Sequence, residues 1–407
     1  MQSVAASEIP DRHNGAGWPP GLELGAFCFC VAQAVFLIAA FALGHWLFDQ
    51  NGARIANDFT GFWPAWRFVL EGNAPLVWDP PSLKAAGNAV IGYDFPGDYP
   101  QFYPPHYMMV FAVFGLLPYM ASYAVWTALN PLPYIYVIYK IIGDRSAILL
   151  ACAFPALLAN LFIGQNGCLT AALIGGALLA MERGRPVLAG VLIGLLTYKP
   201  HFGILIPLAL IASQQWRVFV SAAVTVVAVT GASWLLLGTG AWEGFINAIL
   251  TANQNTLAAG RHDWTKLQSV FGLVRVVGSG VELAWILHGL ATAAMAVWVW
   301  MAWAGRQPFA IKAAVLSAGC LIAAPYAYMY DVMILAIPIA FLLRDGRNRG
   351  FLPGEMMALG AACLLLASFP LVKLPVGVGA AFIVVALIAR RWLSLGPRDA
   401  AVLAQAA

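Results

Sequence analysis

Charged residues are scarce in this chain. Its 407 residues include 22 Lys and Arg and 18 Asp and Glu, so 10% of the residues are charged while 61% are hydrophobic. Soluble globular proteins have roughly 25% charged residues. So few charged side chains cannot cover a soluble protein of this size, and the surplus apolar surface must face lipid. The sequence therefore excludes a soluble protein and predicts an integral membrane protein with many spans.

The chain also lacks dense basic tracts, Cys-x-x-Cys pairs and metal-ligand spacings. Without a basic tract we expect no nucleic-acid partner. The cysteines all fall within expected helices, so neither a disulfide framework nor a thiolate metal site is indicated. No group such as His-x-x-x-His accompanies the carboxylates, and we predict that the protein uses no metal and no other cofactor. The six cysteines are Cys28, Cys30, Cys152, Cys168, Cys320 and Cys363.

Apolar runs bounded by charges, Pro and Gly predict an all-α, polytopic fold. The first run, 22–48, is too long for the core of a signal peptide and lacks a small-residue cleavage site, so we expect it to remain as a spanning helix. Several later helices are short for a bilayer, and their ends are candidate walls of a water-filled cavity. The helices after the first are expected near 121–142, 146–163, 166–181, 186–198, 202–213, 217–237, 281–304, 309–324, 331–343, 354–370 and 376–392.

Basic residues occur at every second connection between these helices, which is the pattern of a cytoplasmic face. Both termini are then cytoplasmic: we expect tails at 1–21 and 393–407 around one transmembrane domain, 22–392, in the cell (inner) membrane. About twelve crossings result, and parity makes the apolar piece 107–117 a juxtamembrane or re-entrant element. The clusters are Arg145, Arg183 with Arg185, Arg217, Arg306, Arg344 with Arg347 and Arg349, and Arg390 with Arg391.

Two outer segments, 49–105 and 238–280, are longer than connectors need to be. Polar residues at the outer ends of several helices open on the same side as these loops. A cavity there would combine the carboxylate of Asp58, the cation of Lys199 and several amides. This combination suits a reaction on a phosphorylated, polyhydroxylated substrate at the lipid boundary. The polar helix ends carry Gln165, Asn166, Lys199, His201, Tyr326, Tyr328 and Asp331.

An ordered set of short motifs resembles glycosyltransferase family 87, whose members are membrane enzymes of the GT-C fold. The family includes the polyprenyl-phosphate-mannose-dependent alpha-mannosyltransferases. The resemblance runs from the first helix to the last third of the chain, and the order of the motifs gives it its specificity. The motifs are Asn57-Asp58-Phe59, Tyr103-Pro104-Pro105, Gly164-Gln165-Asn166-Gly167, Arg183-Gly184-Arg185 followed by Ala189-Gly190, Lys199-Pro200-His201, Gln215-Trp216-Arg217, Ser269-Val270-Phe271-Gly272 and Pro325 to Asp331.

The resemblance implies transfer of a sugar, expected to be mannose, from a polyprenyl-phosphate donor to an acceptor hydroxyl. The transfer would occur on the outer face, with inversion, to a glycolipid or polysaccharide, with membrane lipid alongside. An aspartate early in the first outer loop acts as base in such enzymes, and Asp58 occupies that place. Donor phosphate contacts are expected from Lys199, His201, Arg261 and His262. Substrate contacts are expected from Tyr103, His106, Gln165, Asn166, Tyr326 and Asp331.

The chemistry makes the same demands independently of the family. A hydroxyl is a weak nucleophile until a carboxylate accepts its proton, and a leaving phosphate needs cations or amides to stabilise the charge that it gains. One base with one phosphate clamp is sufficient for inversion, whereas a double displacement needs a second carboxylate nearby. One departure from the family pattern stands out: members often carry a His after the Pro of the last motif, and this chain has Tyr326. His201 or His262 would have to replace it, or the donor differs.

Other interpretations remain open at this stage. About twelve spans is also a common count for a transporter or lipid flippase, although transporters more often place polar groups near mid-bilayer and show repeats. A scaffold or polymer-export subunit is a third interpretation. For single residues, Asp58 could cap a helix that begins at Phe59, Lys199 could reach out to the lipid headgroups, and Gln165 and Asn166 could only serve a tight turn.

Overall fold

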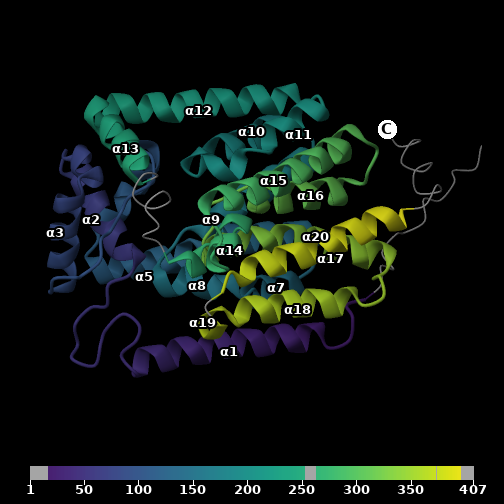
Figure 1. The fold of residues 1–407 in the computed structure, drawn as a ribbon, viewed down its shortest axis with the longest axis horizontal. Helices are drawn as coiled ribbons and strands as arrows, with labels where there is room; N and C mark the ends of the chain where they lie inside the picture. Colours follow the sequence, from purple (N-terminus) through teal and green to yellow (C-terminus); the bar gives the residue numbers. More distant parts are fainter. Residues whose placement is uncertain (1–16, 253–262, 373, 396–407) are drawn as a thin grey trace, which may run out of the picture.

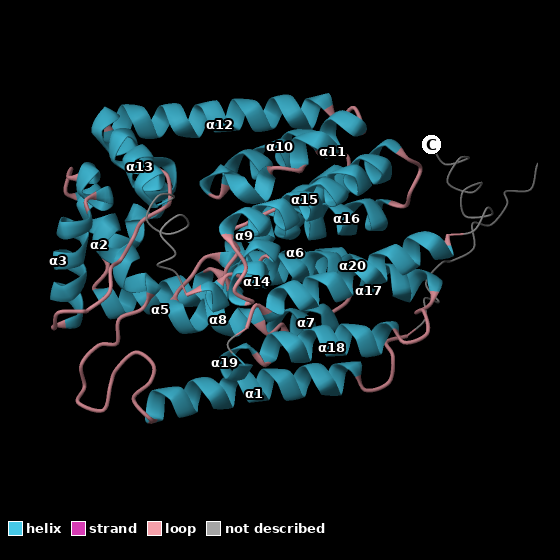
Figure 2. Cartoon of the chain, in the orientation of Figure 1, coloured by secondary structure: helices cyan, strands magenta, loops and turns pink. Residues whose placement is uncertain are grey.

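The computed structural model is helical throughout the part of the chain that it describes, residues 17–252, 263–372 and 374–395. Within these ranges there is no β-strand, only three isolated bridges between extended residues. Figure 2 shows the helices connected mostly by short loops, with two longer connections at 43–57 and 92–104. The predicted all-α class is therefore confirmed.

Four helices are long and apolar enough to cross a membrane: α1 (Leu22–Ala42), α12 (Trp216–Leu237), α15 (Val281–Ala304) and α20 (Val376–Ser394). A fifth candidate is the pair α7 (Ser146–Ala153) and α8 (Ala156–Ile163), which bends by 65° at its break. In Figure 1, α1 and α12 lie along opposite edges of the molecule and run in nearly the same direction as the helices between them. This shared direction is that of a helical bundle in a bilayer.

Six shorter apolar helical segments accompany the candidate membrane spans. At about 1.5 Å per residue, the 16 residues of α9 span roughly 24 Å, less than the ~30 Å of a typical hydrocarbon core. The count of about twelve crossings therefore stays a prediction. These segments are α4 (Pro105–Phe111) with η2 (Ala112–Leu116), α9 (Gly167–Glu182), α10 (Pro186–Leu195) with η3 (Leu196–Tyr198), η4 (Pro200–Gly203) with α11 (Ile206–Ala212), α16 (Phe309–Ile322) and α18 (Glu355–Ala367).

Some of the remaining helices lie at one end of the bundle. Figure 1 shows α2, α3 and α13 standing across that end, at an angle to the long helices. These elements are α2 (Asp58–Leu70), η1 (Ala74–Trp78), α3 (Pro80–Ile91), α5 (Tyr119–Leu129), α6 (Pro131–Ile142), α13 (Thr239–Ala252), η6 (Trp264–Lys266), α14 (Val270–Val276), η7 (Met329–Leu335), α17 (Ala336–Arg349) and α19 (Phe369–Val372).

Two expected helices are interrupted, and proline accounts for both breaks. The helix expected over 121–142 is divided between α5 and α6 at Asn130, with Pro131 beginning the second part. In 146–163, Phe154 adopts an extended conformation before Pro155, as residues before proline tend to do. Gln33 of α1 donates to the carbonyls of Cys152 and Ala153 (3.3 and 3.1 Å), so the groups freed by this break keep a partner inside the apolar body.

The first helix ends at Ala42, earlier than the expected boundary at residue 48. Gly44 has φ +70°, and the backbone N–H of His45 donates to the carbonyl of Ala40 at 2.7 Å. This bond and the left-handed glycine are the features of a common helix C-terminus. The chain then runs through the irregular segment 43–57, which leads to α2.

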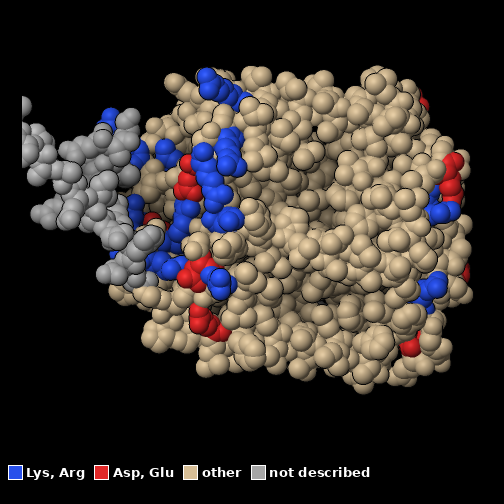
Figure 3. Space-filling view, turned by 180° about the vertical axis from the view of Figure 1, so that it is seen from behind, with Lys and Arg blue, Asp and Glu red and all other residues tan. Residues whose placement is uncertain are grey.

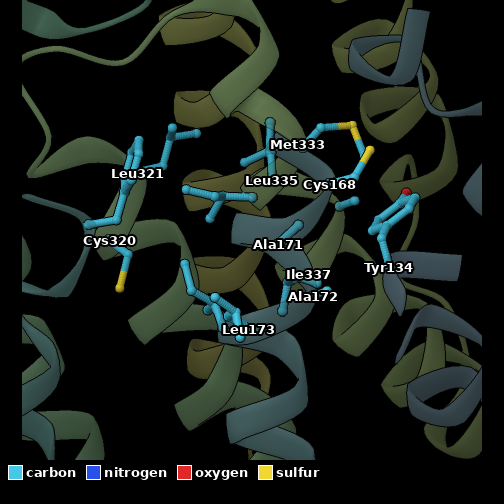
Figure 4. Packing of buried hydrophobic residues seen from close by; sticks show 14 of the residues in the cluster. Tyr134, Cys168, Ala171, Ala172, Leu173, Cys320, Leu321, Met333, Leu335 and Ile337 are labelled. Atoms are coloured by element: carbon cyan, nitrogen blue, oxygen red, sulfur yellow. The ribbon is translucent and has the colours of Figure 1, made fainter. Parts of the chain in front are cut away.

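Helix α9 lies at the centre of the buried core. Figure 4 shows its Ala171, Ala172 and Leu173 among Leu335 of η7 and Ile337 of α17, with Tyr134 of α6 on the other side. Small residues on α9 let the neighbouring backbones approach closely. At its first residue, Gly167, a Cβ atom would lie 1.9 Å from the carbonyl oxygen of Tyr330. Glycine is therefore required where α9 meets η7.

Charged side chains gather at the two ends of the molecule. Figure 3 shows a dense group of Lys and Arg at one end, a few charged residues at the other and a broad uncharged band between them. Trp18 and α17 meet at the basic end: Trp18 Nε1 donates to Asp144 at 3.4 Å, and Arg347 lies 4.6 Å from the Trp18 ring and 3.3 Å from Asp144. Arg391, near the end of α20, pairs with Asp345 of α17 at 2.7 Å. The two ends of the described chain therefore lie on the same side.

Candidate active site

Asp58 is the first residue of α2, but it does not cap this helix. The side chain of Asn57 accepts the backbone N–H of Thr60 at 3.3 Å, and the Thr60 hydroxyl accepts the backbone N–H of Asn57 at 3.1 Å. This reciprocal pair is a capping box. The interpretation of Asp58 as the cap is thus wrong, and its carboxylate is available for another role.

Gln165, in the turn between α8 and α9, binds the Asp58 carboxylate. Its Nε2 atom donates to Oδ2 of Asp58 at 2.7 Å. Its Oε1 atom accepts from the Tyr103 hydroxyl at 3.1 Å and from the backbone N–H of Asn166 at 3.2 Å. Three distant parts of the sequence thus form one hydrogen-bonded group, which contains Asp58, Tyr103 and the neighbours Gln165 and Asn166.

The Asp58 carboxylate is reached by solvent and is also closely surrounded by protein. The residue is exposed, yet burial is the largest influence on the pKa of its carboxyl, which it raises above the ordinary value. The hydrogen bond from Gln165 and the charges of Lys266 and Lys199 act in the opposite direction, while Asp331 raises the pKa further. A side chain that is exposed and yet closely surrounded by protein lies in a concave part of the surface, which is called the Asp58 hollow below.

Lys199 and Asp331 form a buried ion pair near this hollow. The Nζ atom of Lys199 lies 2.5 Å from Oδ1 of Asp331, and the two side chains are only 5% and 2% exposed. The other oxygen of Asp331 accepts the backbone N–H of Tyr328 at 3.1 Å. Lys199 is therefore directed into the protein, and the interpretation that it reaches out to the headgroups is wrong.

Aromatic rings surround the Lys199 ammonium. It lies 4.7 Å from the ring centre of Tyr330, 5.6 Å from that of Tyr103 and 5.9 Å from those of Tyr198 and Phe202. Rings at such distances stabilise a desolvated cation. An ammonium has three N–H groups, and only Asp331 accepts one among the described residues.

Backbone contacts place this pair beside Gln165. The side-chain amide of Asn160 in α8 donates to the carbonyl of Tyr330 at 3.0 Å, and its oxygen accepts the backbone N–H of Gly167 at 2.6 Å. These bonds, with the close approach of Gly167, join the α8–α9 turn to η7. The Pro200 ring follows Lys199 directly and begins the next short helix, so the lysine occupies a tight turn between η3 and η4.

A stack of tyrosines forms a wall next to the hollow. The ring centres of Tyr103 and Tyr107 are 4.6 Å apart, and those of Tyr107 and Tyr198 are 5.1 Å apart. Asn166 donates to the Tyr107 hydroxyl at 3.0 Å, while its own side-chain oxygen is buried without a partner in the described part of the chain. The amides of the α8–α9 turn are thus tied to aromatic residues as well as to Asp58.

The other expected site residues are less closely connected. His201 is half-buried with its ring 4.3 Å from that of Phe202, and its Nε2 has no partner among the described residues. His106 is buried and faces Trp242 of α13, 6.2 Å between ring centres. Tyr326 packs with the small cluster around Phe271. Arg261 and His262 lie outside the described residues.

Lys266 of the segment 238–280 also belongs to the site, although it was not among the expected phosphate contacts. It is exposed at the end of η6 and close enough to Asp58 to lower the pKa of that carboxyl. The next residue, Leu267, pairs with Tyr328 in an isolated bridge, and the backbone N–H of Gln268 donates to Ala327 at 2.6 Å. This pairing brings the second outer loop to η7, and no signal in the local sequence predicts it.

The long apolar helices and the uncharged band between the two charged ends define a membrane protein. Comparison with known families shows which class of membrane protein it is. The profile of glycosyltransferase family 87 matches residues 102–325, more than half of the chain. The chain therefore belongs to glycosyltransferase family 87 and is a membrane glycosyltransferase. No curated protein and no solved structure matches it. Asp58 and Asp331 lie outside the matched residues, so their roles must be argued from geometry.

No three His, Cys, Asp or Glu side chains in the described ranges gather closely enough to hold a metal ion. Instead, the Asp58 carboxylate is bound by the amide of Gln165 and the Asp331 carboxylate by Lys199. Metal-independent transfer stays a prediction, which would be contradicted if EDTA abolished turnover and one divalent ion restored it.

Proposed function

We propose that the protein transfers mannose from a polyprenyl-phosphate donor to a hydroxyl of a glycolipid or polysaccharide, with inversion, on the outer face of the cell (inner) membrane. The observation that carries this proposal is the solvent-exposed carboxylate of Asp58, which lies within electrostatic range of Lys199 and Lys266. A base and cations in one hollow are the groups that transfer from a phosphate leaving group requires.

In this reaction Asp58 accepts the proton of the acceptor hydroxyl. The acceptor oxygen bonds to the anomeric carbon from the side opposite the phosphate, and the bond between that carbon and the phosphate oxygen breaks. Polyprenyl phosphate leaves with one additional negative charge. Asp331 is the other carboxylate nearby, but Lys199 and the backbone of Tyr328 occupy its oxygens. A single free carboxylate supports single displacement, and hence inversion.

The two lysines supply different parts of the phosphate site. Lys199 is neutralised by Asp331 but keeps two N–H groups for a phosphate oxygen, with its direction fixed by the surrounding rings. Lys266 has no carboxylate within ion-pairing distance among the described residues, so its charge is available to balance the charge that develops on the leaving phosphate. His201 would donate from the same side, and Arg261 and His262, which lie outside the described residues, stay candidates for further phosphate contacts.

The outer-face assignment rests on the separation of charge along the bundle. Trp18 and Arg391 lie at the basic end, whereas the Asp58 hollow lies at the opposite end of α9. The positive-inside rule makes the basic end cytoplasmic. Single cysteines at Asp98 and Asn348, both exposed, test this orientation in a protein without the native cysteines. An impermeant reagent outside should label the first only; labelling of the second only would reverse the orientation.

The activity test uses purified protein in liposomes with radiolabelled polyprenyl-phosphate mannose and a membrane extract as acceptor. We expect label to appear in the acceptor with the opposite anomeric configuration. Retention of configuration would exclude the single displacement, and transport of intact donor without transfer would exclude a transferase. Donors that carry glucose or arabinose on the same lipid, assayed in parallel, test which sugar the protein prefers. Faster transfer from either would overturn the mannose assignment.

A further inference from the structure

The side chain of Gln165 can take only one orientation in its site. Its Oε1 atom receives two donors, the Tyr103 hydroxyl and the backbone N–H of Asn166. Rotation of the amide by 180° would place its NH2 group against the Asn166 N–H and leave that N–H without an acceptor. Nε2 must therefore face Asp58, where it donates to Oδ2.

Only one oxygen of the Asp58 carboxylate is occupied by this contact. Within the described ranges, Gln165 is the single hydrogen-bond donor to Asp58, and it binds Oδ2. The remaining oxygen, Oδ1, is therefore the one that can accept a proton. Since the residue is exposed to the hollow, Oδ1 can meet a hydroxyl that enters from solvent.

We propose that Gln165 is a positioning residue for the base: it holds Oδ2 of Asp58 and leaves Oδ1 to accept the proton of the acceptor hydroxyl. This inference rests on the proposed role of Asp58 as base. Tyr103 acts one step further away, because its hydroxyl fixes the direction of the Gln165 amide. Neither residue needs to touch a substrate for this function.

The backbone around Gln165 is held independently of its side chain. The carbonyl of Gln165 accepts from Asn130 at 2.6 Å, its N–H donates to the Asn160 carbonyl at 3.0 Å, and the Gly164 carbonyl accepts from Trp126 at 2.9 Å. A change of the Gln165 side chain should therefore leave the turn in place. This makes substitutions at Gln165 interpretable.

The hydrogen bond from Gln165 also favours the ionised carboxylate. Asp58 is faced by Lys266 of η6 and Lys199 after η3, which favour ionisation. Asp331 of η7 also faces the carboxylate and disfavours its ionisation. Three uncharged tyrosines lie nearby as well: Tyr328 and Tyr330 of η7 and Tyr123 of α5. Donation by an uncharged amide to the charged form lowers the pKa of a carboxyl. Without it the carboxyl would hold its proton to higher pH.

The test is the pH dependence of transfer by Gln165→Leu and Gln165→Glu. We expect kcat of Gln165→Leu to fall on the order of 10- to 100-fold, the factor for losing one hydrogen bond to a charged group, with the donor KM within about twofold. The acidic limb of kcat/KM should move to higher pH, and further for Gln165→Glu, whose carboxylate adds a like charge. Gln101→Leu is a matched control, because Gln101 is also buried, and Asp58 receives its hydrogen bond from Gln165 and not from Gln101 within the described ranges.

A double-variant cycle separates positioning from substrate contact. If Tyr103 acts through Gln165, Tyr103→Phe should slow transfer in the wild type but have little further effect in Gln165→Leu. If the acidic limb of kcat/KM for Gln165→Leu does not move and the donor KM rises, the inference is overturned and Gln165 is a substrate contact. Multiplicative losses in the double variant would also overturn it. An active Asp58→Asn protein is a different outcome, since it removes the base itself.

Discussion

The Nζ atom of Lys199 and the Oδ1 atom of Asp331 lie 2.5 Å apart although 132 positions separate the two residues in the sequence. Each is almost completely buried. A buried charge without a partner is costly, so the two residues depend on each other. The pair joins the turn before η4 to η7 and brings one cation close to Asp58 without adding net charge.

This dependence predicts the behaviour of single and double variants. Lys199→Met should destabilise the fold by about 3–5 kcal/mol because it leaves a buried carboxylate unpaired. Lys199→Met combined with Asp331→Leu should recover much of the thermal stability in detergent, because neither charge remains. The double variant should still bind donor weakly if Lys199 contacts the phosphate. Normal donor affinity in this stable double variant would show that the pair is structural only.

Asp58→Asn should fold normally and lose about two to four orders of magnitude in turnover, the usual scale for a positioned general base. Thermal stability should hardly change because Asn57 and Thr60, not Asp58, cap α2. The matched control is Asp98→Asn in the same outer loop, where the carboxylate is 75% exposed and lies 3.5 Å from Lys84. Near-normal transfer by Asp58→Asn would remove it from the mechanism.

Transfer should decline as the pH falls through the pKa of Asp58, because a protonated carboxyl cannot act as base. Burial raises this pKa, so the decline should be centred above the ordinary Asp value of about 4. Lys266 lowers the pKa of Asp58, and Lys266→Gln should therefore move the decline to still higher pH. Rate measurements from pH 4 to 8 would show the shift; Lys84→Gln, at the Asp98 pair, should not produce it.

Two neighbouring arginines at the end of α20 provide a matched stability test. Arg391 is 3% exposed and bonds to Glu355 at 2.5 Å and to Asp345 at 2.7 Å. Among the described residues, Arg390 donates only to the carbonyl of Pro353. Arg391→Met should lower stability by about 3–5 kcal/mol, since buried Glu355 loses its cation while Asp345 keeps Arg349 at 3.2 Å, whereas Arg390→Met should have an effect below about 1 kcal/mol. Equal melting temperatures for the two variants would contradict this assignment.

Composition predicted the class of the fold better than its details. Scarcity of charge is a property of the whole chain, so it indicated a helical membrane protein without any knowledge of packing. The breaks at Asn130 and Phe154 were missed because proline is tolerated within apolar helices and only the surrounding contacts decide whether the helix continues. Gln33 of α1, distant in sequence, supplies such a contact.

The residues of the site were predicted from the sequence, but their contacts were not. Asp58, Gln165, Lys199 and Asp331 were all expected at outer helix ends, and the structure brings them together. Their actual partners could not be read from the sequence: Lys199 was expected to be free for phosphate, and it is paired with Asp331. Long-range pairing also determines where Lys266 lies, since the bridge between Leu267 and Tyr328 places it.

The shortness of α9 has a consequence for how the donor meets the protein. One end of this helix is fixed at the basic side, where Glu182 binds Arg344 at 2.6 Å, and the other opens at Gln165. In the proposed orientation, roughly 24 Å of helix stands in a hydrocarbon layer of ~30 Å, so Asp58 lies below the level of the outer headgroups. A local thinning of the bilayer would bring the lipid phosphate down to the hollow. Acyl-chain length would then act as a variable of the reaction, and transfer would slow in bilayers of longer lipids while the protein itself stayed unchanged.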